Sequence, residues 1–236
     1  MSHSVDPLIE QYGIDAVTDA MRPLLSEERR ERIEAVLDAR LDGVTVGIEN
    51  LHDPHNGAAA IRSLEAIGIS TLHVVEGVET FRFSPAITIG CEKWLDICRH
   101  RHMSDAARAL HDAGYLLYAA CPGGQGGLEE VAVERPVCIF FGNEHAGLTD
   151  EAVELCDRRL TIPMHGFTQS FNLSVSVAVT MHRLAARRRA ALGRPGDLDG
   201  QKRAFLRARW YAHGVRGAAA IVARHVSEST RPTCPT

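Results

Sequence analysis

The stretch Val137-Cys-Ile-Phe-Phe-Gly-Asn-Glu-His-Ala-Gly-Leu-Thr149 joins a short apolar run to a polar loop. An unbroken apolar run of this length is typical of a strand that is buried on both faces of a parallel sheet. Ligands of parallel α/β sheets bind beyond the carboxyl ends of the strands, which is where Gly142 and Glu144 lie. Glycines near Glu144 allow the backbone to approach a ligand closely. The stretch therefore predicts a strand over 136–141 that delivers a carboxylate to a binding edge, although a plain turn before a capped helix has the same pattern.

Short strands and helices alternate on both sides of this stretch. We expect strands over 44–49, 71–75, 94–98, 115–120 and 160–162, and helices over 26–37, 57–67, 104–113, 149–156 and 170–189. This alternation predicts an α/β domain with a mostly parallel sheet and helices on both faces. No G-x-G-x-x-G motif follows the first strand, so the common dinucleotide-binding loop is not indicated. Glycines cluster instead near the ends of the later strands, and we expect the pocket there.

Composition divides the chain into a helical extension over 1–42, a central domain over 43–192 and a basic helical tail over 193–236. The segment 181–236 holds twelve basic and three acidic residues, whereas the first 180 residues have a net charge of −13. A basic arm on an acidic body is typical of a surface that faces a polyanion such as RNA. A solvated helix face gives the same charge pattern, so charge alone leaves both interpretations open.

The cysteines and the N-terminus bear on the compartment. The six cysteines include no C-x-x-C pair, which argues against a zinc or iron–sulfur site and favours free thiols in a reducing compartment. The first 23 residues lack the basic start and apolar core of a signal peptide, and no apolar run is long enough to span a bilayer. We therefore expect a cytoplasmic protein.

Two further polar segments follow predicted strands. In the first, Asn56 stands where a helix N-cap is expected and Arg62 lies inside the helix, so simple capping and a surface salt bridge are the structural alternatives. In the second, Ser170 and Asn172 precede a long helix, while Pro163 lacks the N–H that a sheet ladder needs. Backbone groups left open in this way suit the edge of an adenine ring.

In their order and spacing, the three segments resemble the three motifs of the SpoU family of RNA ribose 2′-O-methyltransferases, in the SPOUT superfamily. The matching elements are N-x-x-x-x-x-R over Asn56–Arg62, F-G-N-E-x-x-G over Phe141–Gly147, and I-P-M…Q-S-x-N-x-S-V-S over Ile162–Ser176. The resemblance extends from about Ser26 to Arg189, and it is closest to tRNA guanosine 2′-O-methyltransferases of the TrmH type.

The resemblance implies an α/β domain whose C-terminal part is threaded as a deep trefoil knot, a rare exception among protein chains. It implies S-adenosylmethionine as methyl donor, RNA as partner, most of all tRNA, and a homodimer with the site near the subunit interface. Independently of the resemblance, His52, Asp53 and His55 lack a further ligand cluster at a recognisable spacing, so we expect no metal. The cofactor-binding residues that it implies are Ala120, Gly142, Ile162, Met164 and Phe171. The catalytic residues that it implies are Arg62, Asn56, Glu144, Ser170 and Asn172.

The family assigns the removal of the 2′-hydroxyl proton to the arginine that matches Arg62. Because a guanidinium stays protonated under nearly all conditions in proteins, we expect Arg62 to orient the nucleotide and stabilise the developing oxyanion instead. The sequence departs from the common pattern at Cys91, His145, Ala146 and Phe171, which bears on RNA preference rather than on activity.

Two alternatives stay open at this point: an rRNA methyltransferase, and a binding protein without activity. The basic tail is expected to contact the RNA backbone through Arg187, Arg188, Arg189, Lys202, Arg203, Arg207 and Arg209. Trp210 and Tyr211 are expected either to stack on a base or to dock the tail helix onto the rest of the protein.

Overall fold

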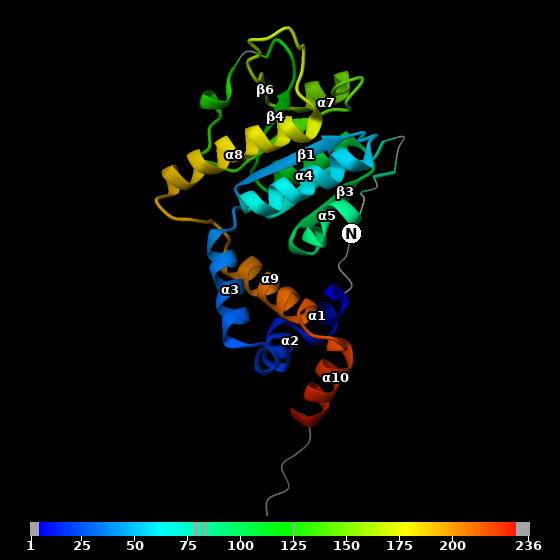
Figure 1. Ribbon diagram of the computed structural model, residues 1–236, viewed down its shortest axis with the longest axis vertical. Coiled ribbons are helices and arrows are strands. Elements are labelled where there is room, and N and C mark those ends of the chain that lie inside the picture. Colours follow the sequence, from blue (N-terminus) through cyan, green and yellow to red (C-terminus); the bar gives the residue numbers. More distant parts are fainter. Residues whose placement is uncertain (1–4, 78–79, 82, 84, 125, 230–236) are drawn as a thin grey trace, which may run out of the picture. The chain divides into compact units, whose positions relative to one another are not determined.

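The computed structural model describes residues 5–77, 80, 81, 83, 85–124 and 126–229, which belong to two compact units (Figure 1). The larger unit contains Arg40–Asp197, and the smaller one joins Ser2–Ala39 with Leu198–Thr236 as far as these are described. The N-terminal extension and the basic tail, which we expected to be separate parts, thus share one unit. The physical reason is that neither segment alone has enough apolar surface to bury a core.

Within the described part of the larger unit, six parallel strands form one sheet in the order β3-β2-β1-β5-β4-β6. The strands are β1 (Val44–Glu49), β2 (Thr71–Val75), β3 (Asp96–His100), β4 (Leu116–Ala120), β5 (Val137–Phe141) and β6 (Arg158–Leu160). β1 and β5 are neighbours, and Ile48 pairs with Phe141 in their register. The loops that follow β1 and β5 therefore start side by side at the carboxyl edge of the sheet.

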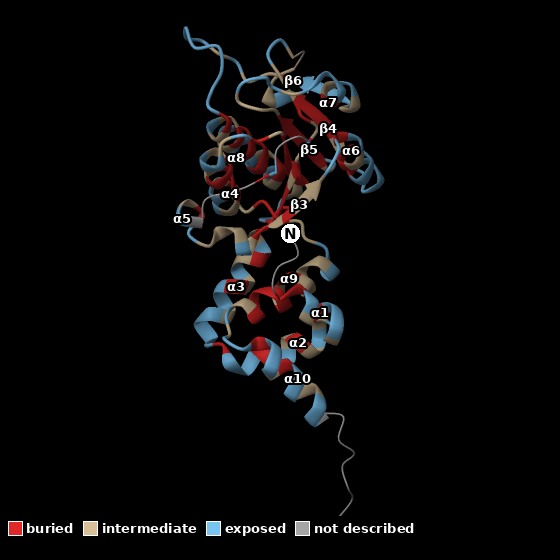
Figure 2. Ribbon diagram, turned by 90° about the vertical axis from the view of Figure 1, so that its right-hand side faces the viewer, coloured by how far each residue is buried: buried red, intermediate tan, exposed pale blue. Residues whose placement is uncertain are grey.

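Helices cover both faces of this sheet, which confirms the expected α/β class with a parallel sheet. They are α4 (Pro54–Ile67), α5 (Pro85–Thr88), α6 (Met103–Asp112), α7 (Asp150–Leu155) and α8 (Leu173–Leu192). Figure 2 shows α4 and α8 on one side of the sheet and α6 on the other. Strands that are covered on both faces must be apolar throughout, as the sequence of β5 is.

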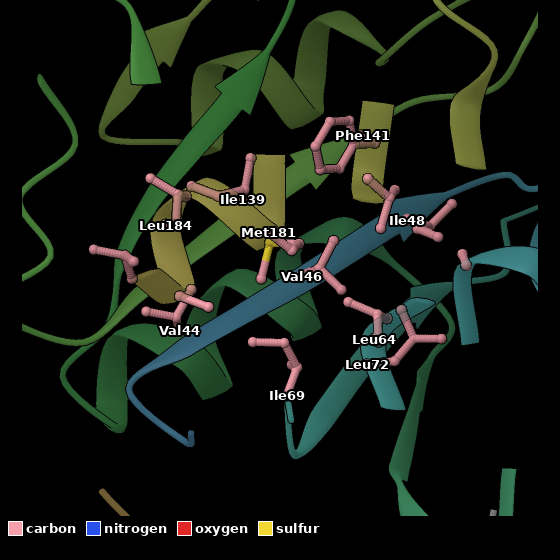
Figure 3. Close-up of a cluster of buried hydrophobic side chains, with 14 of the residues drawn as sticks. Val44, Val46, Ile48, Leu64, Ile69, Leu72, Ile139, Phe141, Met181 and Leu184 are labelled. Atoms are coloured by element: carbon pink, nitrogen blue, oxygen red, sulfur yellow. The ribbon is translucent and has the colours of Figure 1, made fainter. Parts of the chain in front are cut away.

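The main core lies between the sheet and the pair α4 and α8 (Figure 3). Its centre combines Val46 of β1, Leu64 of α4 and Met181 of α8, all fully buried. On the opposite face, the ring of Phe140 packs so closely over β1 that a Cβ at Gly47 would lie 2.2 Å from it. Gly47 is thus required by this close approach.

Element boundaries differ from the sequence-based expectations mainly at the edges of the sheet. β3 and β6 are each displaced by two residues from the expected strands, because the apolar residues Trp94 and Ile162 lie outside the hydrogen-bonded ladder. Helix α8 begins at Leu173 rather than at Ser170, since Asn172 is its N-cap: the Asn172 Oδ1 accepts a hydrogen bond from the Ser174 amide at 2.9 Å.

The smaller unit is helical in the residues described. It consists of α1 (Asp6–Tyr12), α2 (Ile14–Met21), α3 (Glu27–Ala39), α9 (Gly200–His213) and α10 (Ala218–Ser229). Gly13, with φ of 84°, separates α1 from α2. Trp210 and Tyr211 are both buried in this unit, so they dock α9 rather than stack on a base. Among the described helices, none is long and apolar enough to cross a membrane.

Asp197 fixes the entry into β1 from a distant point of the chain. Its carboxylate accepts hydrogen bonds from the backbone amides of Asp42, at 2.6 Å, and Gly43, at 3.1 Å. It also receives the Nε of Arg188 at 2.9 Å, and both side chains of this pair are at most 9% exposed. A buried ion pair that holds two backbone amides determines where the central strand begins.

We predict that Asp197→Ala lowers the free energy of unfolding by about 3–5 kcal/mol, because the Arg188 guanidinium stays buried without its counter-ion. Urea denaturation of the full chain measures this loss. The matched control is Asp105→Ala, which breaks the exposed Asp105–Arg108 pair and is expected to change the same quantity by at most about 1 kcal/mol. Equal effects of the two substitutions would contradict this assignment.

Candidate functional site

Two loops meet at the carboxyl edge of the sheet, one following β1 and one following β5. The carboxylate of Glu49, only 3% exposed at the end of β1, accepts two hydrogen bonds from Thr149, one from its amide and one from its Oγ1, each at 2.8 Å. The Asn143 Nδ2 donates to the Asn50 carbonyl at 2.7 Å. Three hydrogen bonds thus join the loop after β1 to the loop after β5.

The β5 loop also folds tightly on itself. The Asn143 Oδ1 accepts hydrogen bonds from the amides of His145, at 2.7 Å, and Ala146, at 3.2 Å. A Cβ at Gly142 would lie 1.9 Å from the Gly147 carbonyl carbon, so only glycine fits at position 142. The loop therefore holds Glu144 in a fixed place.

The Asn56 side chain connects the three segments that sequence analysis singled out. Its Nδ2 donates to the Glu144 Oε1 at 2.7 Å, and its Oδ1 accepts from the Asn172 Nδ2 at 2.9 Å. The structural alternative for Asn56, simple helix capping, is wrong, because Asp53 is the N-cap of α4 and accepts a hydrogen bond from the His55 amide at 2.8 Å. The side-chain amide of Asn56 therefore takes no part in capping and links Glu144 with Asn172.

One oxygen of this network is left open. The Glu144 Oε2 is inaccessible to solvent, yet it has no hydrogen-bond partner among the described residues. A buried acceptor without a partner is unfavourable by about 1–3 kcal/mol, so an incoming hydroxyl or amine that donates to it is stabilised. The network can therefore bind and orient a donor group.

A cavity of about 310 Å³ lies beside the network, at the low end of the range for small-molecule sites. Its lining consists of Ala120, Cys121, Pro122, Gly123, Phe141, Thr161, Ile162, Met164, Gln169, Ser170, Phe171 and Ser176. None of these side chains carries a charge. The cavity thus offers apolar contacts, hydroxyls and backbone groups to an organic ligand of modest size.

Four of the five residues expected to bind a cofactor line this cavity, namely Ala120, Ile162, Met164 and Phe171, and Gly142 directly follows the lining residue Phe141. Ser170, expected to be catalytic, lines it too. The backbone next to the cavity is tightly packed, since a Cβ at Gly124 would lie 2.5 Å from the Leu160 carbonyl carbon. The ends of β4, β5 and β6 and the loop before α8 together enclose the cavity.

Arg62 lies apart from the Asn56 network. It is exposed on α4, and six residues at 3.6 per turn place it on a different side of the helix from Asn56. Its positive charge acts on Cys91: burial raises the pKa of that thiol, and Arg62 counteracts part of the increase. Of the five residues expected to be catalytic, the structure joins Asn56, Glu144 and Asn172 by hydrogen bonds and places Ser170 at the cavity.

The three arginines expected to bind RNA near the end of α8 contact other parts of the same unit. Arg187 donates to the Leu128 carbonyl and Arg188 pairs with Asp197, as described above. Arg189 donates to two backbone carbonyls at 2.8 Å. These contacts hold α8 in place within the unit.

The other four expected RNA-binding residues are on α9: Lys202, Arg203, Arg207 and Arg209. Arg203 and Arg207 both pair with Glu34 of α3, and hydrogen bonds from Arg207 and Arg203 hold the pKa of that carboxyl below its usual value. Arg209 forms a buried pair with Asp6 at 2.7 Å. Part of the positive charge of the tail is thus balanced by acidic residues of the N-terminal segment.

Sequence reasoning did not single out Glu49, Thr149 and Cys121 as parts of the site. The available signal was positional, because Glu49 ends β1 and Cys121 follows β4, at the edge where ligands of parallel sheets bind. Thr149, which binds Glu49, is one hundred residues away in the chain, so their contact has no local sequence pattern.

Comparison with known proteins agrees with this geometry. Residues 43–182 match the model of the SpoU rRNA Methylase family. The chain is 31% identical over 185 residues to a tRNA (guanosine(18)-2′-O)-methyltransferase of Borreliella burgdorferi, covering 78% of this chain and 82% of that protein.

Two solved structures are similar. The A. aeolicus TrmH/SpoU tRNA modifying enzyme has a TM-score of 0.70 at 26% identity, covering 80% of this chain and 98% of that one. The SpoU methyltransferase AviRb of Streptomyces viridochromogenes, in complex with AdoMet, has a TM-score of 0.57 at 25% identity, covering 65% of this chain and 64% of that one.

We predict that Glu49→Gln lowers the free energy of unfolding by about 1–3 kcal/mol, because a glutamine has one acceptor oxygen for the two donors of Thr149. Chemical denaturation measures the change. Thr149→Ser keeps the amide, the hydroxyl and the capping of α7, so this control is expected to lose less than about 1 kcal/mol. A larger loss for Thr149→Ser than for Glu49→Gln would contradict the role of the carboxylate.

Proposed function

We propose, because the chain belongs to the SpoU rRNA Methylase family, that it is an S-adenosylmethionine-dependent methyltransferase acting on a ribose 2′-hydroxyl of RNA. The observation that carries the proposal is the joining of all three motif segments through Asn56, directly beside an uncharged cavity. A guanosine in tRNA is the proposed substrate. The name of the Borreliella burgdorferi relative supports this choice and gives position 18 as the first nucleotide to test.

The lining of the cavity fits S-adenosylmethionine. Ile162, Met164 and Phe171 offer apolar surface for an adenine ring, while Ser170 and Thr161 offer hydroxyls. Pro163 cannot donate to a neighbouring strand, which leaves backbone groups of this loop for the ring edge. When bound, S-adenosylmethionine supplies a methyl group on a positively charged sulfur, a good leaving group.

The protein has two tasks in this reaction: to hold the ribose oxygen in line and to stabilise the charge that develops on it. Asn56 and Asn172 fix the carboxylate of Glu144, whose open Oε2 accepts a hydrogen bond from a ribose hydroxyl. Arg62 is exposed, and in its protonated form it orients the nucleotide and stabilises the oxyanion. The proton leaves to water or to a phosphate oxygen.

A homodimer is part of this proposal. An exposed apolar stripe lies on α8 and just before it. It consists of Phe171, Val175 and Val179, which are four residues apart and each more than 40% exposed. Phe167, in the preceding loop, is fully exposed. A second copy that covers this stripe by two-fold symmetry removes it from water. The position of Arg62 away from Asn56 agrees with a site that is completed near such an interface.

Three further parts of the proposal rest on more general support. Close backbone packing between Gly124 and Leu160 agrees with threading of the last strand and its loop as a trefoil knot. Arg188 and Arg209 are buried in ion pairs and are left out of the proposed RNA surface. The RNA backbone is proposed to contact the half-buried basic residues, in exchange for some of their present partners; these are Arg187, Arg189, Lys202, Arg203 and Arg207. The described cysteines are all free thiols, which agrees with a cytoplasmic enzyme.

We predict that the protein transfers labelled methyl from S-adenosylmethionine to unmodified bulk tRNA, and that Arg62→Ala reduces the rate at least about 100-fold, the scale for removing one transition-state donor. Nuclease digestion followed by chromatography locates the label on a ribose. Label on rRNA alone would show that the substrate is ribosomal RNA rather than tRNA. No transfer to either RNA would contradict the proposed function.

We predict that the double substitution Val175→Asp and Val179→Asp converts the protein from dimer to monomer, because two buried, unpaired carboxylates oppose association. Light scattering after size-exclusion chromatography measures the mass. Ala109→Asp places a charge on the exposed side of α6 and is expected to leave the dimer intact. A wild-type monomer would refute the dimer.

A further inference from the structure

Two segments have no permanent cation: the loop after β1 with the start of α4, which carries Asn56, and the loop after β5, which carries Glu144. Over residues 50–57 and 142–150, all of which the structure describes, there is no arginine and no lysine. Asp53, Glu144 and Asp150 carry negative charge in the same segments. A polyanionic substrate that enters here needs donors to its phosphates, and the imidazoles of His52, His55 and His145 are the ionisable side chains that supply them.

Two of these imidazoles touch across the two loops. The rings of His52 and His145 lie edge to face, with centroids 5.9 Å apart and planes at 72°. Both residues are exposed to solvent. They come from segments that are 93 residues apart in sequence, so the contact exists only because the two loops are joined.

The contact depends on hydrogen bonds between the Asn143 side chain and the backbone of the two loops, rather than on the rings themselves. The His145 amide donates to the Asn143 Oδ1, and the Asn143 Nδ2 donates to the Asn50 carbonyl, each at 2.7 Å. One asparagine side chain thus fixes both the strand end that leads to His52 and the turn that bears His145. A pair that is placed in advance loses little conformational freedom when it binds a ligand.

Two other roles of the His52–His145 pair, metal binding and packing in the core, fit the structure less well. Among the described residues, no group of three or more potential ligands is placed to hold a metal ion. Exposed rings at loop tips bury little apolar area, so the pair contributes little to the core. An imidazole, by contrast, has an N–H donor in its neutral form and two in its charged form, so it can bind a phosphate oxygen in either state.

We propose that His52 and His145 together bind a backbone phosphate of the substrate RNA, next to the nucleotide whose ribose is methylated. This inference rests on the proposed function. It adds a phosphate-binding element that neither the three motifs nor the basic tail includes. Because phosphate contacts carry no base information, the pair sets affinity and register without choosing the sequence.

The test compares His52→Ala, His145→Ala and the double variant with wild type, using two unmodified tRNA transcripts of different sequence. The dissociation constant of each transcript is measured by filter binding, and that of S-adenosylmethionine by calorimetry. We expect each single variant to weaken both transcripts about tenfold and to an equal extent, with unchanged binding of S-adenosylmethionine. His145→Lys, which restores a donor, is expected to recover most of the affinity.

The matched control is His102→Ala, which removes an exposed imidazole at the start of α6. It is expected to change no RNA affinity by more than about twofold. Normal methyl transfer with unchanged RNA affinity in the double variant would overturn the phosphate pair and leave the proposed function intact. A loss confined to one transcript would indicate a base contact and would also overturn the pair. A wild-type protein that binds no RNA would overturn both proposals.

Discussion

The site depends on one constraint: β1 and β5 are adjacent parallel strands, and the loops after them are held together by a buried carboxylate. Glu49 ends β1 and binds Thr149 at the far end of the β5 loop, through both of its oxygens. Parallel pairing brings the two loops to the same edge, and this carboxylate fixes their mutual position. Asn56 can reach Glu144, and His52 can reach His145, because that position is set.

The cavity proposed for the methyl donor and the polar network proposed to act on RNA are built from different side chains. The cavity is lined by uncharged groups from the ends of β4, β5 and β6, whereas the polar network belongs to the loops after β1 and β5 and to the start of α8. Ser170 and Phe171 line the cavity, and Asn172, the next residue, enters the network. The segment before α8 is thus the physical link between the two halves of the site.

Much of the fold and site was predictable because it is encoded locally. The apolar run of β5, with its glycine-flanked Glu144, predicts a buried strand that ends at a binding edge. The motif pattern points to Asn56 and Asn172, which the structure joins by a hydrogen bond. Long-range pairing was not predictable. Neither the Glu49–Thr149 contact nor the pairing of Arg207 with Glu34, 173 residues away, has a local pattern. Edge strands were misplaced for a related reason, since an edge strand needs less regular burial than a central one.

The same reasoning explains why the sequence alone leaves helix capping open as an alternative for Asn56. An asparagine near a helix start satisfies the capping rule by composition, but Asp53 at the preceding turn takes that role, and only the three-dimensional contact to Glu144 reveals the second use. The measurement that tests the separation of cavity and network most directly is calorimetric binding of S-adenosylmethionine to Glu144→Gln, alongside its methyl-transfer rate. Affinity within about twofold of wild type, with the rate strongly reduced, is the predicted result. Loss of S-adenosylmethionine binding in this variant would contradict the account.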